Sequence, residues 1–161
     1  MVEPGPGNAS YRTAAEPPAE FARALVTGLQ MLQDREVMPL TAAQAVPGKP
    51  PAIPFARTQL SALYVASAVA SLQALYETMG LANGVPKDKS WMPTWIAQAF
   101  ARLAEDAPAA LQQSASTKKD AEWGRRLRML RFHVEGIRKL VGRELAPAAG
   151  LMIGFNELDG D

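Results

Sequence analysis

The stretch WGRRLRMLRFHVEGIRKLV, residues 123–141, decides the fold class of this chain. Its large apolar residues recur at alternating steps of four and three, the period of about 3.5 residues that marks a helix in a left-handed bundle. Acidic residues precede the stretch and basic residues close it, as the helix dipole favours. The sequence predicts a long helix that ends at Pro147 and buries Trp123, Leu127, Leu130, Val134, Ile137 and Val141.

Two more helices are predicted in the first half of the chain, joined by a long proline-rich crossover. Residues 18–38 form the first, which Pro39 ends, and residues 39–54 hold too many prolines for a helix or a central strand. Residues 55–81 form the second, an Ala- and Ser-rich helix that we expect to be central. The predicted buried faces are Phe21, Leu25, Leu29 and Leu32 in the first helix, and Leu60, Leu63, Tyr64, Ser67, Ser71, Leu72, Leu75, Tyr76 and Met79 in the second.

A third helix, residues 93–113, completes the set, and Pro108 is expected to end or kink it. Its predicted apolar face is Trp95, Ile96, Ala99, Phe100 and Leu103. No run alternates like a strand over more than four residues, so the sequence predicts an all-α four-helix bundle. We expect residues 1–16 to be a flexible arm and residues 17–161 to be the bundle. The tail after Ala148 is apolar before it becomes acidic, which predicts that it docks onto the bundle.

Composition limits the chemistry. The chain has 161 residues, no cysteine and a single histidine, so disulfides, thiolate nucleophiles and sites that need two imidazoles are excluded within one chain. No apolar run approaches the length of about 20 residues that a membrane span needs, and the N-terminus does not resemble a signal peptide. A haem held by His133 and a methionine is conceivable, but a half-exposed flank residue beside Met129 and Phe132 is the simpler interpretation of His133.

Residues 118–143 hold nine Lys and Arg against three acids, which could form a face for nucleic acid or an anionic membrane. The spacing favours a different interpretation. Arg131, Arg138 and Lys139 lie three or four residues from Glu135, and Arg125 and Arg126 lie likewise from Glu122. We therefore predict a solvated, internally paired face and no nucleic-acid partner, with a basic adaptor as an alternative.

The C-terminal residues Gly154-Phe155-Asn156-Glu157-Leu158-Asp159-Gly160-Asp161 closely resemble the signature Gly-Phe-Asn-x-Leu-Asp-Gly-Asp that ends imelysin-like proteins. The segment from Pro54 to Thr58 also resembles the family's Trp-Arg-Ser start of a long Leu-rich helix, except that Ala56 replaces an aromatic residue. The resemblance is to the C-terminal half of such a protein only, and it involves about residues 18–161 of this chain.

The resemblance implies an all-helical bacterial envelope protein, located in the periplasm and linked to iron acquisition. The family's Gly-x-His-x-x-Glu motif, its proposed metal site, has no counterpart here, so no cofactor is expected in this chain, although a full-length member could bind iron or another divalent metal. The expected partner is the missing N-terminal half or a second copy. The residues that carry over, as contributors to the surface between the halves, are Arg57, Phe155, Asn156 and Asp159.

These observations predict a non-catalytic binding or interaction domain. The alternatives are a metallopeptidase-related domain, which the older family label suggests, and the basic adaptor. A metal-assisted hydrolase would need ligands that the chain lacks, so no catalytic residue is assigned. Asp159 and Asp161 are weak candidates for a hard-cation site, because their carboxylate oxygens suit such ions.

Overall fold

A computed structural model describes residues 3–45, 54–114 and 121–153, which are helices, turns and short irregular segments without a strand. Two of the four long helical rods are continuous assemblies of several elements, each with a π-helical turn in its course. The first rod is α1 (Glu16–Leu32), η1 (Gln33–Val37) and α2 (Met38–Ala45), the middle rods are α3 (Ser61–Met79) and α4 (Trp91–Ser114), and the last is α5 (Ala121–Leu140), η5 (Val141–Leu145) and α6 (Ala146–Ala148).

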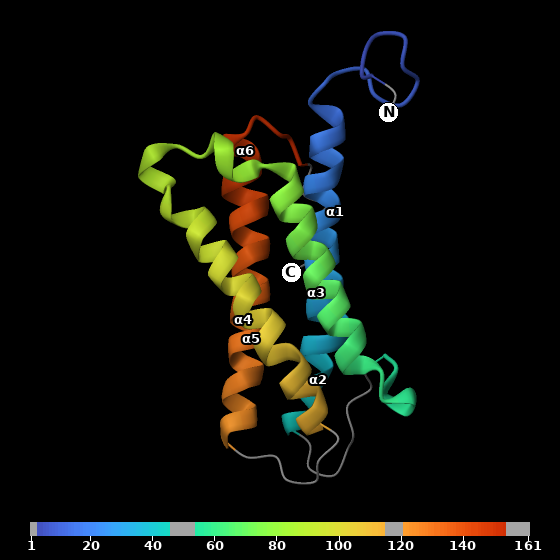
Figure 1. The fold of residues 1–161 in the computed structure, drawn as a ribbon, viewed down its shortest axis with the longest axis vertical. Coiled ribbons are helices and arrows are strands. Elements are labelled where there is room, and N and C mark those ends of the chain that lie inside the picture. Colours follow the sequence, from blue (N-terminus) through green and yellow to red (C-terminus); the bar gives the residue numbers. More distant parts are fainter. Residues whose placement is uncertain (1–2, 46–53, 115–120, 154–161) are drawn as a thin grey trace.

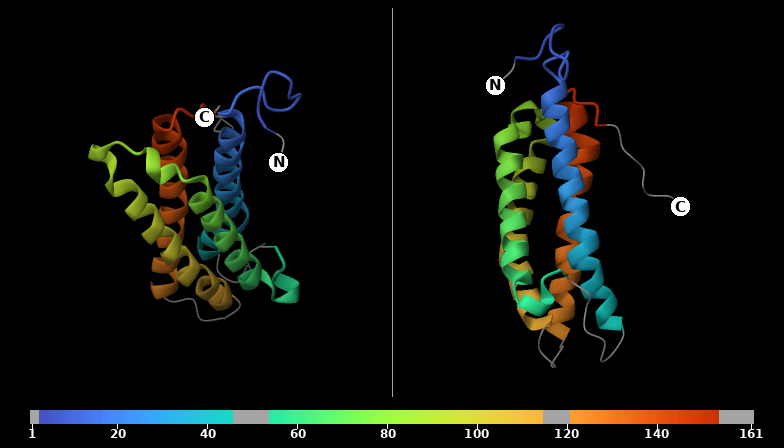
Figure 2. Two further views of the ribbon diagram at one scale, coloured as in Figure 1. Left: turned by 45° about the horizontal axis from the view of Figure 1, so that its top comes forward. Right: turned by 90° about the vertical axis from the view of Figure 1, so that its right-hand side faces the viewer.

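The four rods form an up-down-up-down bundle. In Figure 1 the chain descends along α1, rises along α3, descends along α4 and rises again along α5. Contacts join α1 to α3, α3 to α4, α4 to α5 and α5 back to α1, and Figure 2 shows α3 and α4 as one layer against α1 and α5. The predicted all-α four-helix bundle is confirmed.

The core lies between the two layers, and the apolar residues of the stretch 123–141 form part of it. All six predicted seam residues of α5 and η5 are buried, and the large Trp123 ring is fully enclosed. Trp123 also donates its indole N–H to the carbonyl oxygen of Ala110 at 3.0 Å, which ties the start of α5 to the last turns of α4. Leu25, Leu29 and Leu32 of α1 are buried as predicted, whereas Phe21 is exposed.

One carboxyl group lies in this apolar core. Glu36, in the π-helical turn η1, is only 2% exposed, and neither of its carboxyl oxygens has a hydrogen-bond partner. Burial raises the pKa of Glu36 to about 7, and the nearby Arg35 offsets that rise only in part. The core therefore favours the protonated form of this side chain.

The predicted helix end at Pro39 is wrong, because α2 continues to Ala45. The predicted end at Pro147 agrees with the structure to within one residue, since α6 ends at Ala148. Each proline follows a π-helical turn closely, and a wide bond closes each turn: the Met38 N–H donates to Gln33 and the Ala146 N–H to Val141. A proline conflicts with a regular helix because it lacks an N–H and its ring meets the carbonyl four residues back. The widened turn relieves that conflict, so the chain stays helical for six residues past Pro39 and for one residue past Pro147.

Pro108 also fails to end its helix, because α4 continues to Ser114. Ala107, Ala110 and Leu111 around it are buried, and this packing holds the segment helical despite the missing hydrogen bond. Helix α4 also begins two residues earlier than predicted, at Trp91. Of its predicted apolar face, Ile96, Ala99, Phe100 and Leu103 are buried and Trp95 is half-buried.

Helix α3 differs from its prediction in start and in orientation. Phe55 and Gln59 have positive φ values around the short turn η2 (Ala56–Thr58), so the helix begins at Ser61. Its buried residues are Ser61, Val65, Val69 and Tyr76, whereas the predicted Leu60, Leu63, Tyr64, Ser67 and Ser71 face solvent. Because apolar residues surround this helix, its periodicity does not determine which side faces the core.

The two ends of the described chain pack differently. Leu151 is buried and Ile153 packs against the core, so the start of the tail docks as predicted, although Met152 is exposed. The rest of the predicted docked tail, residues 154–161, and residues 46–53 of the crossover lie outside the described residues. The N-terminal arm forms a loop beyond α1, held by the Tyr11 hydroxyl donating to Glu20 at 2.8 Å.

Candidate ligand groove between α4 and α5

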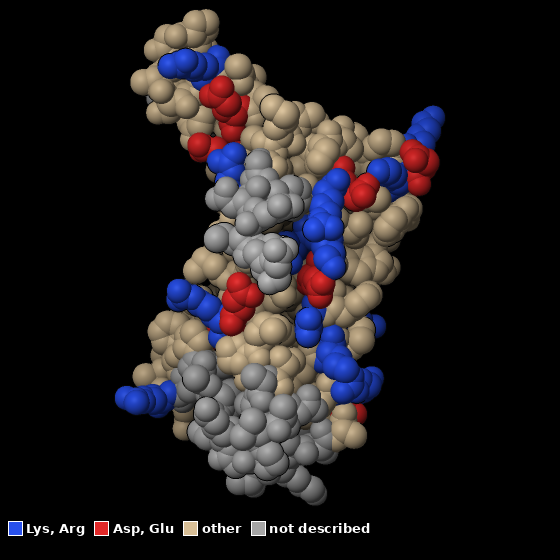
Figure 3. Space-filling model, turned by 180° about the vertical axis from the view of Figure 1, so that it is seen from behind, with Lys and Arg blue, Asp and Glu red and all other residues tan. Residues whose placement is uncertain are grey.

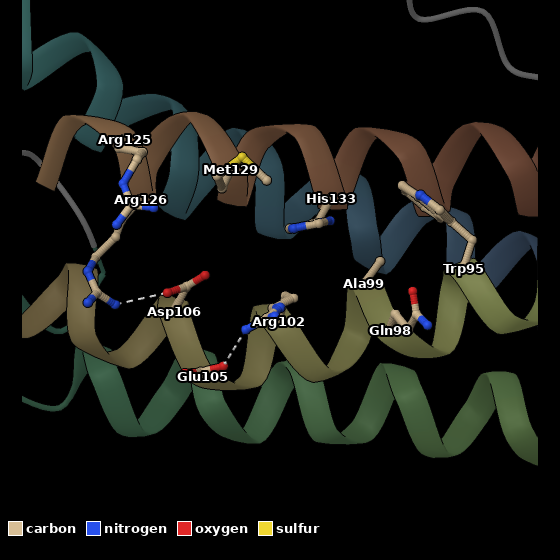
Figure 4. A pocket seen from close by; sticks show the side chains of 10 residues that line it. All are labelled: Trp95, Gln98, Ala99, Arg102, Glu105, Asp106, Arg125, Arg126, Met129 and His133. Atoms are coloured by element: carbon tan, nitrogen blue, oxygen red, sulfur yellow. Dashed lines mark hydrogen bonds and ion pairs between the residues drawn. The ribbon is translucent and has the colours of Figure 1, made fainter. Parts of the chain in front are cut away.

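A groove of about 530 Å³ lies between the antiparallel helices α4 and α5. Figure 4 shows side chains from both helices converging on it, with an aromatic group at one end and charged groups at the other. Its volume lies within the range of about 300–1,000 Å³ typical of small-molecule sites. It is lined by Trp95, Gln98, Ala99, Arg102, Glu105 and Asp106 from α4, and by Arg125, Arg126, Met129 and His133 from α5.

The aromatic end depends on a close approach of Trp95 to α5. A Cβ at Gly136 would lie 2.3 Å from Cη2 of Trp95, so only glycine lets the indole rest against the helix. The Trp95 ring centroid lies 5.9 Å from that of Phe132 and 6.1 Å from that of His133. Trp95 thus closes one end of the groove as a packed aromatic wall.

The charged end is an ion-pair network that bridges the two helices. Arg126 donates to Asp106 of α4 at 2.9 Å and to Glu122 of its own helix at 3.2 Å. Arg125 binds the same Glu122 carboxylate at 3.1 Å. A guanidinium group held on two sides is fixed in position, so this network sets the shape of the charged end.

Arg102 adds a third guanidinium from α4, and it is held less firmly. Its Nη1 pairs with Glu105 at 3.2 Å, and both side chains are largely exposed. Arginine carries five N–H donors, so one such contact leaves most of its donors available to another acceptor. The groove therefore presents guanidinium donors without requiring that the existing ion pairs break.

His133 lies between the two ends. Its Nδ1 is buried without a hydrogen-bond partner, and burial lowers the pKa of the imidazole; Asp106 opposes this shift and Arg102 adds to it. The ring is consequently neutral at pH 7, with one nitrogen as donor and the other as acceptor. Its neighbours include Met129 and Phe132, as the sequence predicted.

This arrangement suits binding of a small amphipathic molecule. A flat apolar ring can pack on Trp95 and His133, while an anionic group at the other end can accept N–H bonds from arginine. The buried, unpaired Nδ1 of His133 is a feature that packing stability alone does not explain.

Away from the groove, two of the three ion pairs predicted around Glu135 form, whereas the Nε atom of Arg138 is buried without a hydrogen-bond partner. Lys139 contacts Glu135 at 2.6 Å and Arg131 contacts it at 3.9 Å, one turn away on either side. These contacts and the positive charge of Arg138 hold the pKa of Glu135 below its usual value. Figure 3 shows basic and acidic side chains alternating along the back of the molecule.

Of the residues predicted for a binding or inter-domain surface, Arg57 alone lies within the described ranges. Arg57 is exposed in η2, before α3, and is not among the groove residues. Phe155, Asn156, Asp159 and Asp161 lie outside the described residues, so the structure gives no position for the predicted tail contacts or the weak metal candidates. Within the described ranges, no three or more acidic or histidine side chains cluster as metal ligands would.

The residues of the groove escaped the sequence analysis because they come from two helices whose register is a tertiary property. The available signals were local: Arg102 and Asp106 lie one turn apart on α4, and Gly136 interrupts an otherwise bulky helix. Their relation to Trp95 and Arg126 appears only when α4 and α5 pack together.

Comparison with known proteins returns no match for this chain among protein-family models, curated proteins or solved structures. Among the described residues, no helix combines the length and apolar character needed to cross a membrane.

Proposed function

We propose that this protein is a non-catalytic helical binding domain whose α4–α5 groove holds a small organic anion that carries a planar ring. The observation that carries the proposal is the combination, in one groove, of an aromatic wall at Trp95 and guanidinium donors at Arg102 and Arg125. The ring would pack against Trp95 and His133, and the anionic group would accept N–H bonds from the arginines.

Charge and exposure support the anion as the recognised feature. Arg102 and Arg125 are mostly exposed and each has one ion-pair contact through a single guanidinium nitrogen in the groove network. An incoming carboxylate can use their remaining donors. Arg126, which is anchored to Asp106 and Glu122, serves to fix the groove rather than to bind the anion.

Titration with benzoate, followed by the three tryptophan indole N–H resonances in NMR spectra, tests this proposal. Benzoate should shift the Trp95 resonance and leave Trp91 and Trp123 unchanged. Benzamide, which has the same ring without the charge, should bind at least about tenfold more weakly, because it lacks the charge-assisted hydrogen bond.

Arg102→Gln should weaken benzoate binding, and Arg128→Gln, an exposed α5 residue that does not line the groove, should not. Equal affinity for benzoate and benzamide would contradict the role of the anion. Benzoate shifts that appear at Trp91 and spare Trp95 would contradict the groove itself.

We further propose, from the terminal octapeptide, that this chain corresponds to the C-terminal half of an imelysin-like envelope protein in the bacterial periplasm with a role in iron acquisition. The all-α bundle is compatible with that relation, but many unrelated proteins share the architecture. Cell fractionation and comparison of protein levels in iron-limited and iron-replete cultures test it. A protein that stays in the cytosolic fraction at an iron-independent level would contradict it.

A further inference from the structure

The exposed side of α3 carries a regular apolar seam that nothing in the described structure covers. Leu63 is 65% exposed and Leu60 is 49% exposed. The exposed positions follow steps of three and four, the spacing of a helix that packs against another helix in a left-handed coiled coil. We call this set the outer seam of α3: Leu60, Leu63, Ser67, Ala70, Ala74 and Glu77, with Tyr64 and Ser71 beside it.

The outer seam is unusual for a solvent-facing helix because α3 has no charged residue from Ser61 to Tyr76. Exposed helix faces of monomeric proteins normally carry charges, whereas contiguous apolar surface marks an interface. Phe55 extends the surface, with its ring centroid 5.1 Å from that of Tyr64.

We propose that this seam binds the same seam of a second copy of the chain, with the two α3 helices antiparallel and the two-fold axis at Ser67. The argument is the symmetry of residue size about that position. Leu60 and Ala74 lie seven residues before and after Ser67, Leu63 and Ser71 lie four, and Tyr64 and Ala70 lie three. Each large side chain therefore meets a small residue of the other copy, as knobs-into-holes packing requires.

Charge complementarity supports the antiparallel direction. Arg57 lies in η2, just before the start of α3, and Glu77 lies in the last turn of α3; both are exposed. An antiparallel pair places Arg57 of each copy at the end where the other copy has Glu77. One Glu77 oxygen accepts from Gln73 at 2.9 Å, which leaves the other oxygen for this contact. A parallel pair would instead juxtapose like charges at both ends.

The register identifies the occupant of the seam. A different protein could bind to any apolar surface on α3. Such binding would not require that each bulky residue on one side of Ser67 has a small residue at the same distance on the other side. The α4–α5 groove takes no part in this contact, so the proposal does not depend on the proposed ligand.

The chain has no cysteine, so single cysteines can report the register by disulfide cross-linking. Ser67→Cys should form a covalent dimer in a mild redox buffer, because the two Ser67 positions meet at the axis. Arg128→Cys, a control at another exposed position, on α5, should stay monomeric under the same conditions.

Leu63→Cys and Ser71→Cys should each cross-link poorly alone and efficiently when mixed. In the proposed register identical Leu63 residues lie about 12 Å apart along the helix axis, beyond the Cα separation of about 7 Å that a disulfide tolerates.

Analytical ultracentrifugation supplies a measurement that needs no cysteine. The wild-type chain should show a concentration-dependent dimer. Arg57→Glu and Glu77→Arg should each weaken it about fivefold, and the double variant should recover the wild-type affinity.

A chain that stays monomeric into the high micromolar range, with Ser67→Cys cross-linking no faster than Arg128→Cys, would overturn the proposal and leave the seam to another protein. Efficient cross-linking of Leu63→Cys with itself would also overturn it, because that result requires either parallel helices or a two-fold axis near Leu63 instead of Ser67.

Discussion

The Trp95 indole rests on Gly136, with the position of an added Cβ only 2.3 Å from Cη2. This contact joins α4 to α5 at the aromatic end of the groove. Position 136 requires glycine because the indole occupies the space of a side chain. The backbone conformation does not impose this requirement, since the residue is helical. The shape of the groove therefore depends on a residue with no side chain.

Gly136→Ala should displace Trp95 and open the aromatic end. The expected loss of stability is about 1 kcal/mol, because overpacking exceeds the gain in helix propensity. Chemical denaturation measures the stability, and the Trp95 indole resonance reports the movement. Trp95→Phe in the Gly136→Ala chain should recover part of the loss, since the shorter ring no longer reaches the new methyl group.

Gly7→Ala serves as the control, because no heavy atom lies within 4 Å of a Cβ built there. Gly7→Ala should change neither the stability nor the Trp95 indole resonance. An unmoved Trp95 resonance in Gly136→Ala would show that the indole does not occupy this position in solution.

The buried Glu36 should make the stability of the bundle depend on pH. Its pKa in the folded chain is about 7 against the ordinary value of 4.5, so the folded state retains a proton that the unfolded state releases. The neutral side chain contributes fully to the free energy of unfolding below the pKa of the unfolded chain, 4.5. This contribution is lost as the pH rises through the pKa of the folded chain, about 7. The loss amounts to about 3 kcal/mol between pH 4.5 and pH 7 and levels off above that range.

Glu36→Gln should remove this component, so the variant gains stability over the wild type as the pH rises. The difference between their unfolding free energies, measured from pH 4 to pH 8, isolates the effect from other titrating groups. Glu105→Gln, on the exposed side of α4, should behave as the wild type does. Parallel stability profiles for Glu36→Gln and wild type would show that Glu36 is hydrated.

Trp123→Phe should destabilise the bundle by about 2 kcal/mol or more, because it leaves a cavity and removes the donor to the Ala110 carbonyl. Trp91→Phe is the matched control, since Trp91 is 53% exposed and Trp123 is fully buried. We expect its effect to stay within about 0.5 kcal/mol. Thermal or denaturant unfolding compares the two, and equal losses would contradict the buried position of Trp123.

The Arg126–Asp106 pair should show a coupling energy of about 0.5–1 kcal/mol in a double-mutant cycle of Arg126→Gln and Asp106→Asn. The two side chains are 31% and 21% exposed, so solvent weakens the attraction without removing it. Added salt should reduce the coupling, because mobile ions screen partly exposed charges. Zero coupling at low salt would mean that the pair does not hold α4 to α5.

The amino-acid sequence by itself determined the all-α class, the buried seam of the last helix and the local ion pairs around Glu122 and Glu135. These features depend on residues three or four positions apart on one helix, where the helical repeat fixes their relation. The predicted contacts of Arg131 and Lys139 with Glu135 follow from that repeat alone.

Only the tertiary structure decided which side of α3 faces the core, whether the first helix continues through Pro39, and where the groove lies. An apolar surface on several sides gives α3 more than one possible orientation, and contacts with α1 and α4 select the one that buries Val65 and Val69. The groove joins Trp95 to Gly136 and Arg126 to Asp106 across two helices. Those distances depend on how the helices pack, which no local periodicity encodes.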